Sequence, residues 1–205
     1  MNPDFQIYAA HGMFWSAFGV TLVVLRVVFG RDRSLGREPS AERAPAAEEV
    51  HTARHSRALI AFHSIAFAVM YFGIALAVFG HRMPVWFAGQ RGVGKIVIAA
   101  AAALMVFTLV HFRSWRFRAT LNRGHELATG GTFRLMRHPI YMSLNLLALG
   151  SAIWIPSVLL WVAVILMVIG SDLRGRAEER ILEAAFGERY RAYCRGTSRF
   201  VPYVY

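Results

Sequence analysis

Four long apolar blocks dominate the sequence and limit what it can fold into. They cover residues 7–29, 58–79, 93–112 and 140–170. An α-helix that crosses the hydrocarbon core of a bilayer needs about 20 apolar residues. Hydrophobic residues make up 56% of the 205-residue chain, which is a larger fraction than soluble globular proteins usually have. The sequence therefore predicts an all-α, polytopic membrane protein.

The fourth block, residues 140–170, is too long for one crossing and short for two. Gly150-Ser151 and Ile155-Pro156-Ser157 lie near its middle, and glycine and proline disfavour a continuous helix there. We therefore predict a hairpin of two short helices in this block. Together with one helix in each of the other blocks, this gives five transmembrane helices.

The placement of arginine supports this count. Arginines are concentrated between the first and second blocks, between the third and fourth blocks, and after the fourth block. The loop between the second and third blocks has only Arg82 and Arg91. Loops rich in Lys and Arg stay in the cytoplasm. A hairpin puts all three arginine-rich segments on one side, whereas a single crossing would export the tail. The prediction is an integral, multi-pass protein with its N-terminus outside and its C-terminus and active site in the cytoplasm.

Charge and cysteine content narrow the possible partners. The net charge of +11 is explained by this topology and by contact with anionic lipid headgroups, so nucleic acid is not needed as a partner. Cys194 is the only cysteine, which excludes an internal disulfide and a multi-cysteine zinc site. No Lys or Arg precedes Arg26, so we expect a retained first helix rather than a cleaved signal peptide.

The chain divides into two regions. Residues 1–112 are expected to form three transmembrane helices with a polar cytoplasmic linker at 31–57. Residues 113–205 are expected to carry the functional site. Its parts are the cytoplasmic segment 113–139 and the tail from Asp172, which flank the hairpin and so must lie close together.

The stretch MRHPIYMS, residues 136–143, lies at the start of the predicted hairpin. Pro139 suits the first position of a helix because it has no N–H to lose. Arg137 and His138 then lie just outside that helix, at an end that attracts anions through free N–H groups and the helix dipole. His125 supplies a second imidazole on the same side. Arg137 and His138 are either interfacial anchors on lipid phosphate or part of a site.

The tail contains a charged helical stretch, DLRGRAEERILEAAFGERYRAY, at residues 172–193. At 100° per residue, Arg174 and Glu178 fall on the same side as Ile181 and Ala185. The opposite side, predicted to be solvated, consists of Arg176, Glu179, Arg180 and Glu183. Arg174 and Glu178 are therefore either an ion pair that reaches water at the bilayer surface or one wall of a polar ligand pocket under the hairpin.

Several of these residues recur at set distances in a known group of membrane enzymes. The matching positions are His125, Thr129, Gly131, Arg137, His138, Pro139, Tyr141, Glu178, Glu179, Phe186, Gly187, Tyr190, Tyr193 and Pro202. From about residue 113 onward, the chain resembles the isoprenylcysteine carboxyl methyltransferase family and its phospholipid methyltransferase relatives. The resemblance implies an integral membrane methyltransferase that uses S-adenosylmethionine, with a cytoplasmic C-terminal helix capping the cofactor site.

The resemblance also implies roles for individual residues. The residues expected around the cofactor are His125, Leu127, Ala128, Phe133, His138, Pro139, Ile140, Tyr141 and Glu178. Arg174 would face the substrate, and Arg174, Glu178 and Arg137 form the expected catalytic set. Phe133 stands where eukaryotic members tend to have tyrosine, so one hydroxyl is missing.

The chemistry of S-adenosylmethionine fits these residue types. A helix N-terminus beside Arg137 and His138 suits its carboxylate, and Glu178 suits its ammonium group. Phe133 or Tyr141 could stack on adenine or face the sulfonium. Methyl transfer is an in-line displacement that depends on positioning and a dry site. A chain without an obvious nucleophile or metal cluster is compatible with it, and no metal site is predicted.

The predicted acceptor is hydrophobic or lipid-like and enters from the bilayer. An isoprenylcysteine-type carboxylate is already ionised, so Arg174 would only orient it; a phospholipid amine or a thiol would need Glu178, Glu179 or a histidine as base. His63 and Asn145 are intramembrane polar groups that either line the entry path or hydrogen-bond between helices.

Two other classes of protein are alternatives. Membrane sterol reductases resemble the same C-terminal architecture but bind NADPH and usually have more helices than five. A non-catalytic membrane binding protein would keep the fold, yet it would be expected to have lost its charged residues. The retention of Arg137, His138, Arg174 and Glu178 favours the methyltransferase.

Overall fold

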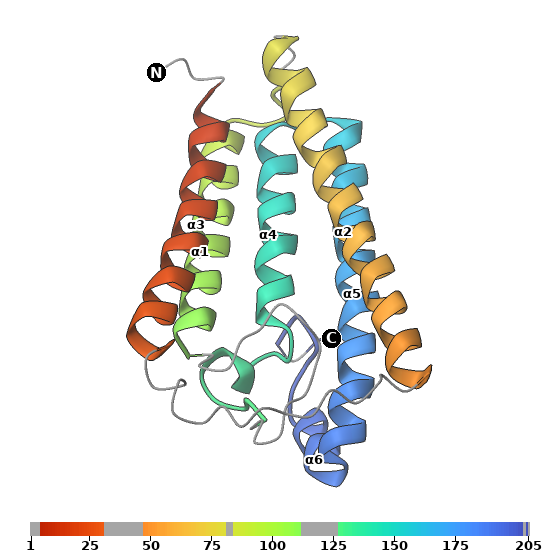
Figure 1. Ribbon diagram of the computed structural model, residues 1–205. Helices are drawn as coiled ribbons and strands as arrows, with labels where there is room; N and C mark the ends of the chain where they lie inside the picture. Colours follow the sequence, from red (N-terminus) through yellow and green to blue (C-terminus); the bar gives the residue numbers. More distant parts are fainter. Residues whose placement is uncertain (1–4, 31–46, 81–83, 112–126, 203, 205) are drawn as a thin grey trace.

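The computed structural model describes residues 5–30, 47–80, 84–111, 127–202 and 204. The helices in these ranges are α1 (Gln6–Gly30), α2 (Ala47–Phe79), α3 (Gln90–His111), the short 3₁₀ helix η3 (Gly131–Arg134), α4 (Pro139–Trp154), α5 (Val158–Phe186) and α6 (Glu188–Arg195). The long helices α1 to α5 alternate in direction, with the start of α1 at one end of the bundle and α6 at the other (Figure 1). Within the described ranges the all-α prediction is confirmed.

Four of these helices are long and apolar enough to cross a membrane. The candidate spans among the described residues are Gln6–Leu25, Ala58–Phe79, Gln90–His111 and Val158–Phe186. Helix α4 has 16 residues. At 1.5 Å per residue it is about 24 Å long, shorter than a hydrocarbon core of about 30 Å. The number of five spans therefore stays a prediction, although α4 packs along α3 in the middle of the bundle (Figure 1).

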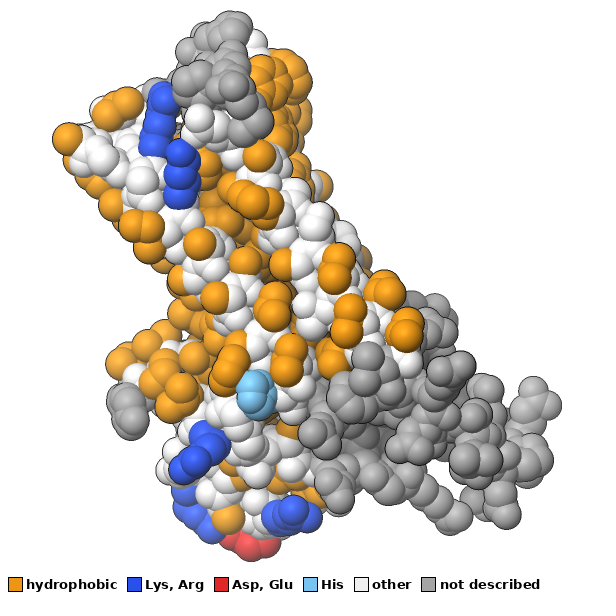
Figure 2. Space-filling model, turned by 90° about the vertical axis from the view of Figure 1, so that its left-hand side faces the viewer, with side chains coloured by type: hydrophobic (Ala, Val, Ile, Leu, Met, Phe, Trp, Pro, Cys, Tyr) orange, Lys and Arg blue, Asp and Glu red, His pale blue; other side chains and the backbone are white. Residues whose placement is uncertain are grey.

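The outer surface of the bundle is apolar along the helices. On the face shown in Figure 2, hydrophobic side chains cover the long middle part and Lys and Arg gather near the two ends. Val20, Val23 and Ile96 are 61%, 61% and 70% exposed. Apolar side chains exposed over such an area suit contact with lipid rather than with water.

The fourth apolar block is a helical hairpin, and its break lies at one of the two predicted places. Helix α4 ends at Trp154, and residues 155–157 connect it to α5. Ser157 caps α5, because its hydroxyl oxygen accepts a hydrogen bond from the Leu160 N–H at 3.3 Å. The other expected breaker, Gly150-Ser151, lies inside α4 and serves helix packing instead.

Two boundaries differ from the sequence-based expectation. Helix α5 does not end at residue 170 but continues to Phe186, so the charged stretch after Asp172 extends a membrane helix directly. Residues 47–57, predicted as part of the linker at 31–57, form the first turns of α2. Alanine and glutamate are abundant there, and both favour helix. The rest of that linker, residues 31–46, lies outside the described residues.

Helices α3 and α4 approach each other closely at two glycines. A Cβ atom added at Gly94 would lie 2.8 Å from the Gly150 carbonyl oxygen, and one added at Gly150 would lie 3.0 Å from the Gly94 carbonyl oxygen. Small residues at such crossings are typical of helices that pack within membranes. This contact holds α4 in the centre of the bundle, where its first turn faces α5.

A chain of hydrogen bonds ties α1 to α2 and α4. The Trp15 indole N–H donates to the Tyr71 hydroxyl at 2.6 Å, and His11 Nδ1 lies 3.1 Å from the same hydroxyl. His11 Nε2 lies 2.9 Å from Ser151 Oγ, whose hydroxyl donates to the Leu147 carbonyl at 2.7 Å. Each side-chain polar atom in this chain has a partner, so the chain stabilises the packing of the N-terminal helices.

Candidate active site

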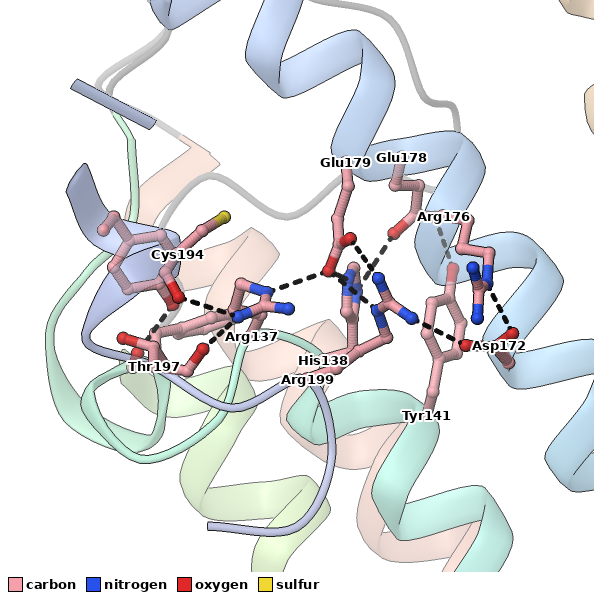
Figure 3. A network of polar contacts seen from close by, with 12 residues as sticks. Arg137, His138, Tyr141, Asp172, Arg176, Glu178, Glu179, Cys194, Thr197 and Arg199 are labelled. Carbon is pink, nitrogen blue, oxygen red and sulfur yellow. Dashed lines mark hydrogen bonds and ion pairs between the residues drawn. The ribbon is translucent and has the colours of Figure 1, made fainter. Parts of the chain in front are cut away.

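Three segments that are distant in sequence meet at the polar end of the bundle. They are the start of α4, the charged extension of α5 and the tail after α6 (Figure 3). Pro139 occupies the first position of α4, as its sequence context predicts, which leaves Arg137 and His138 just before the helix. The Arg137 N–H donates to the Ser198 carbonyl at 2.9 Å and the His138 N–H to the Arg199 carbonyl at 3.1 Å. The tail is thereby held against the beginning of α4.

His138 lies between two adjacent glutamates of α5. Its Nε2 is 3.2 Å from Glu179 Oε1, and its Nδ1 is 3.7 Å from Glu178 Oε2. The imidazole stacks on the Tyr141 ring, with centroids 5.6 Å apart, and the Phe200 ring lies 5.9 Å away. His138 is 7% exposed. Both ring nitrogens therefore face carboxylates of the protein itself; the imidazole is hydrogen-bonded to Glu179 and lies beside Glu178.

Gly175 permits this close approach of α5. A Cβ atom at this position would lie 3.3 Å from both Cδ2 and Nε2 of His138. Glycine inside a helix costs about 1 kcal/mol relative to alanine. Gly175 thus lowers the local helix propensity of α5, and it is also the residue that lets the His138 ring lie against this helix.

Glu178 is the more open of the two carboxylates. Its Oε1 accepts hydrogen bonds from the Tyr141 hydroxyl and from Arg174 Nε, the latter at 3.4 Å. The Arg174 guanidinium lies over the Tyr141 ring, 5.5 Å from its centroid, in a cation–π contact. The Glu178 side chain is 29% exposed, against 14% for Glu179. The structure thus brings together the partly exposed Glu178 and Arg174 beside the buried ring of Tyr141.

Glu179 is the centre of the ion-pair network, so the prediction of a solvated side chain was wrong. Arg137 Nε donates to Glu179 at 2.8 Å, and two nitrogens of Arg199 donate at 3.1 and 2.8 Å. Arg199 also binds Asp172 at 2.9 Å. The helical wheel assigned one buried face to this stretch, whereas α5 here is flanked by α4 on one side and by the tail on the other (Figure 3).

Arg137 fastens the tail. Besides its contact with Glu179, the guanidinium donates to the carbonyl oxygens of Cys194, at 3.3 Å, and Thr197. The Arg137 side chain is 13% exposed. Its charge is therefore directed at groups of the protein in this structure, and its contact with a ligand carboxylate stays a prediction.

The helix η3 is joined to α6 by a half-buried tyrosine. The Tyr193 hydroxyl donates to the Phe133 carbonyl at 2.6 Å. Burial raises the pKa of the Tyr193 hydroxyl above its ordinary value, so this group stays protonated and remains a donor. On the other side of η3, Gly131 has a φ of +61°, and a Cβ there would lie 3.0 Å from the Cβ of His111 on α3. The segment before α4 is thus held between α3 and α6.

The other residues predicted around the cofactor have different surroundings. Leu127 is buried and Ala128 is half-buried, just before η3. Pro139 is buried, and Ile140 packs against the apolar core. His125 lies outside the described residues. Leu127, Ala128, Pro139 and Ile140 are apolar, so they contribute shape rather than charge to the site.

Sequence reasoning missed Arg199, Asp172 and the inward direction of Glu179. Within the described ranges, no group of three or more His, Cys, Asp or Glu side chains is arranged to hold a metal ion. The site instead offers an accessible carboxylate beside a guanidinium and an aromatic ring. Such a set suits a ligand cation and a ligand anion held side by side.

The fold and the site define a class: a helical membrane protein with a charged site assembled at one end of the bundle. The family model for phospholipid methyltransferases matches residues 87–189, about half of the chain. The chain therefore belongs to the phospholipid methyltransferase family, part of the membrane methyltransferases that include the isoprenylcysteine enzymes, and the resemblance seen in the motifs is confirmed. No curated protein matches the chain.

Proposed function

We propose that this protein is an integral membrane methyltransferase that uses S-adenosylmethionine and acts on a hydrophobic, lipid-like acceptor. Its family consists of membrane methyltransferases, which generally use this cofactor. One observation carries the proposal: the accessible Glu178 carboxylate lies beside the Tyr141 ring and the Arg174 guanidinium at the polar end of the bundle. This arrangement provides charge and aromatic surface where a membrane helix meets its charged extension.

The residues present fit the cofactor. Glu178 Oε2 is 3.7 Å from His138 Nδ1, too far for a strong hydrogen bond, so it has capacity left for an ammonium group. The rings of Tyr141 and His138, 9% and 7% exposed, lie beside this carboxylate and would border adenine or a sulfonium. Among the described side chains none caps the start of α4, whose first N–H groups therefore suit a carboxylate.

When bound, S-adenosylmethionine supplies an electrophilic methyl group, and the protein's part is to position the reactants. Glu178 would hold the cofactor's ammonium group, and the apolar residues of the segment before α4 would exclude water. Arg174, 20% exposed beside Glu178, would orient the acceptor. These roles require no proton transfer from a residue of the site.

An acceptor carboxylate, of the isoprenylcysteine type, is favoured over an amine. Both glutamates are engaged with donors: Glu178 with Tyr141 and Arg174, and Glu179 with two arginines and His138. A carboxylate is ionised at neutral pH and needs no base, whereas an amine or thiol must lose a proton. A guanidinium is also the side chain that matches carboxylate geometry.

The membrane orientation is part of the proposal. The start of α1 and the site lie at opposite ends of the bundle (Figure 1). If α4 crosses the bilayer with the four longer helices, the N-terminus is outside. The arginine-rich segments and the site are then cytoplasmic, as the distribution of arginine requires. Residues 113–205 would form the catalytic region.

Removal of the Glu178 charge tests cofactor binding. We expect calorimetric titration of the detergent-purified protein to show binding of S-adenosylhomocysteine and none of NADPH. Glu178→Gln keeps the size of the side chain but loses the charge, so affinity should fall by about tenfold or more. Glu183→Gln, on the exposed surface of the same helix, is the matched control and should bind like wild type. Binding of NADPH alone would indicate a reductase, and binding of neither would indicate a non-catalytic protein.

The acceptor is tested by following a labelled methyl group. Membranes containing the protein are incubated with labelled S-adenosylmethionine and either a prenylated cysteine with a free carboxylate or phosphatidylethanolamine. We expect label in the prenylated cysteine, released by mild base because the product is a methyl ester. Base-stable label in phosphatidylethanolamine would instead show that the acceptor is an amine.

A further inference from the structure

We propose that Arg199 is a positioning residue, which orients the Glu178 carboxylate through Glu179 and His138. The inference rests on the proposed function, because Glu178 is the group that would hold the cofactor. Arg199 lies beyond residues 87–189, the part of the chain that the family model matches, so that match gives it no role. Its importance follows from its contacts alone.

The backbone around Arg199 is fixed, so its side chain starts from a defined point. Residues Met136 and Ser198 form an isolated parallel bridge, and the His138 N–H donates to the Arg199 carbonyl at 3.1 Å. The next residue, Phe200, is 5% exposed and packs its ring against His138. A side chain anchored in this way loses little further entropy when it forms an ion pair.

The Arg199 guanidinium bridges two carboxylates of α5. It donates to Glu179 at 3.1 and 2.8 Å and to Asp172 at 2.9 Å, from a side chain that is 14% exposed (Figure 3). Glu179 and Asp172 stand about two turns apart on the helix. Two donors on one carboxylate fix its plane as well as its distance. Arg199 thereby determines how Glu179 faces α4.

Glu179 passes this orientation to Glu178 through one imidazole ring. Glu179 Oε1 lies 3.2 Å from His138 Nε2. The ring meets Glu178 in two ways: Nδ1 lies 3.7 Å from Glu178 Oε2, an electrostatic contact rather than a hydrogen bond, and the ring stacks on Tyr141, whose hydroxyl donates to Glu178 Oε1. Arg137 contacts the same Glu179 oxygen at 2.8 Å and holds it from the other side. Because imidazole is rigid, the position of one nitrogen sets the direction of the other. A residue of the tail thus orients a carboxylate that it does not contact.

The first test compares two arginines that bind the same aspartate. Full-length protein with Arg199→Ala, Arg199→Lys or Arg176→Ala is titrated with S-adenosylhomocysteine. Arg176 binds Asp172 at 2.6 Å from a side chain that is 50% exposed, and its loss should leave affinity unchanged. Arg199→Ala should weaken binding by about tenfold, the effect of one charged hydrogen-bonding partner. Arg199→Lys keeps the charge but lacks the planar set of N–H donors of a guanidinium, so its affinity should be intermediate.

A double-mutant cycle shows whether Arg199 acts through Glu179. If it does, Arg199→Ala with Glu179→Gln should weaken binding no more than the weaker-binding single variant. In turnover, KM for S-adenosylmethionine should rise while kcat changes little, which a general loss of folded protein would not produce. Arg199→Gln replaces the alanine variant if the latter does not purify.

The outcomes separate this inference from the proposed function. Wild type that does not bind S-adenosylhomocysteine would refute both. Wild type that binds, together with an Arg199→Ala variant of equal affinity, would refute only the role of Arg199. Additive losses in the cycle would also refute it, because Arg199 would then act independently of Glu179.

Discussion

Glu179→Ala is expected to lower the free energy of unfolding by about 3 kcal/mol. The carboxylate accepts hydrogen bonds or ion pairs from Arg137, Arg199 and His138, and its side chain is 14% exposed. Its removal leaves two guanidinium groups close together without their shared counter-ion. The tail would also lose its contacts with α5 through Glu179, although the Arg199–Asp172 ion pair would remain. Unfolding in mixed micelles of increasing dodecyl sulfate content, followed by circular dichroism, measures the difference.

The neighbouring glutamate provides the control for this prediction. Glu178→Ala removes the same chemical group one residue earlier on α5, but from a side chain that is 29% exposed. It should change the free energy of unfolding by about 1 kcal/mol or less, while it weakens cofactor binding. If Glu178→Ala were the more destabilising of the two, the network would not be centred on Glu179.

Gly94→Ala is expected to destabilise the protein by about 2–3 kcal/mol. The added Cβ would lie 2.8 Å from both the Gly150 carbonyl oxygen and the Cβ of Trp154. The Gly150 carbonyl is backbone inside α4, so it cannot turn away as the end of a flexible side chain can. Relief requires α3 and α4 to separate, which breaks the packing of apolar side chains along both helices. The same micellar unfolding experiment measures this loss.

Gly92 on the same helix is the matched control. A Cβ added there meets nothing within 4 Å. Since alanine favours helix over glycine by about 1 kcal/mol, Gly92→Ala should be neutral or slightly stabilising. A Gly94→Ala variant as stable as the Gly92→Ala variant would show that α3 and α4 do not cross as closely as described.

Most of the helical framework can be predicted from local sequence features. The candidate span Ala58–Phe79 has the limits of its apolar block, Pro139 begins a helix, and residues 155–157 interrupt the last block. These features are predictable because a chain in lipid must satisfy its backbone hydrogen bonds within each segment. The proximity of Arg174 and Glu178 is equally local, because residues four apart share one side of a helix.

The roles of Glu179 and Arg199 were decided only by the tertiary structure. Glu178 and Glu179 point about 100° apart on α5, and the sequence alone gives no reason for both to face the rest of the protein. Both do so because α4 lies against one side of the helix and the tail against the other, with His138 between the two carboxylates. Hydrophobic periodicity finds the side of a helix that faces lipid or core. An ion pair between segments far apart in sequence leaves no periodic pattern in that sequence. It can therefore be recognised only in the folded structure.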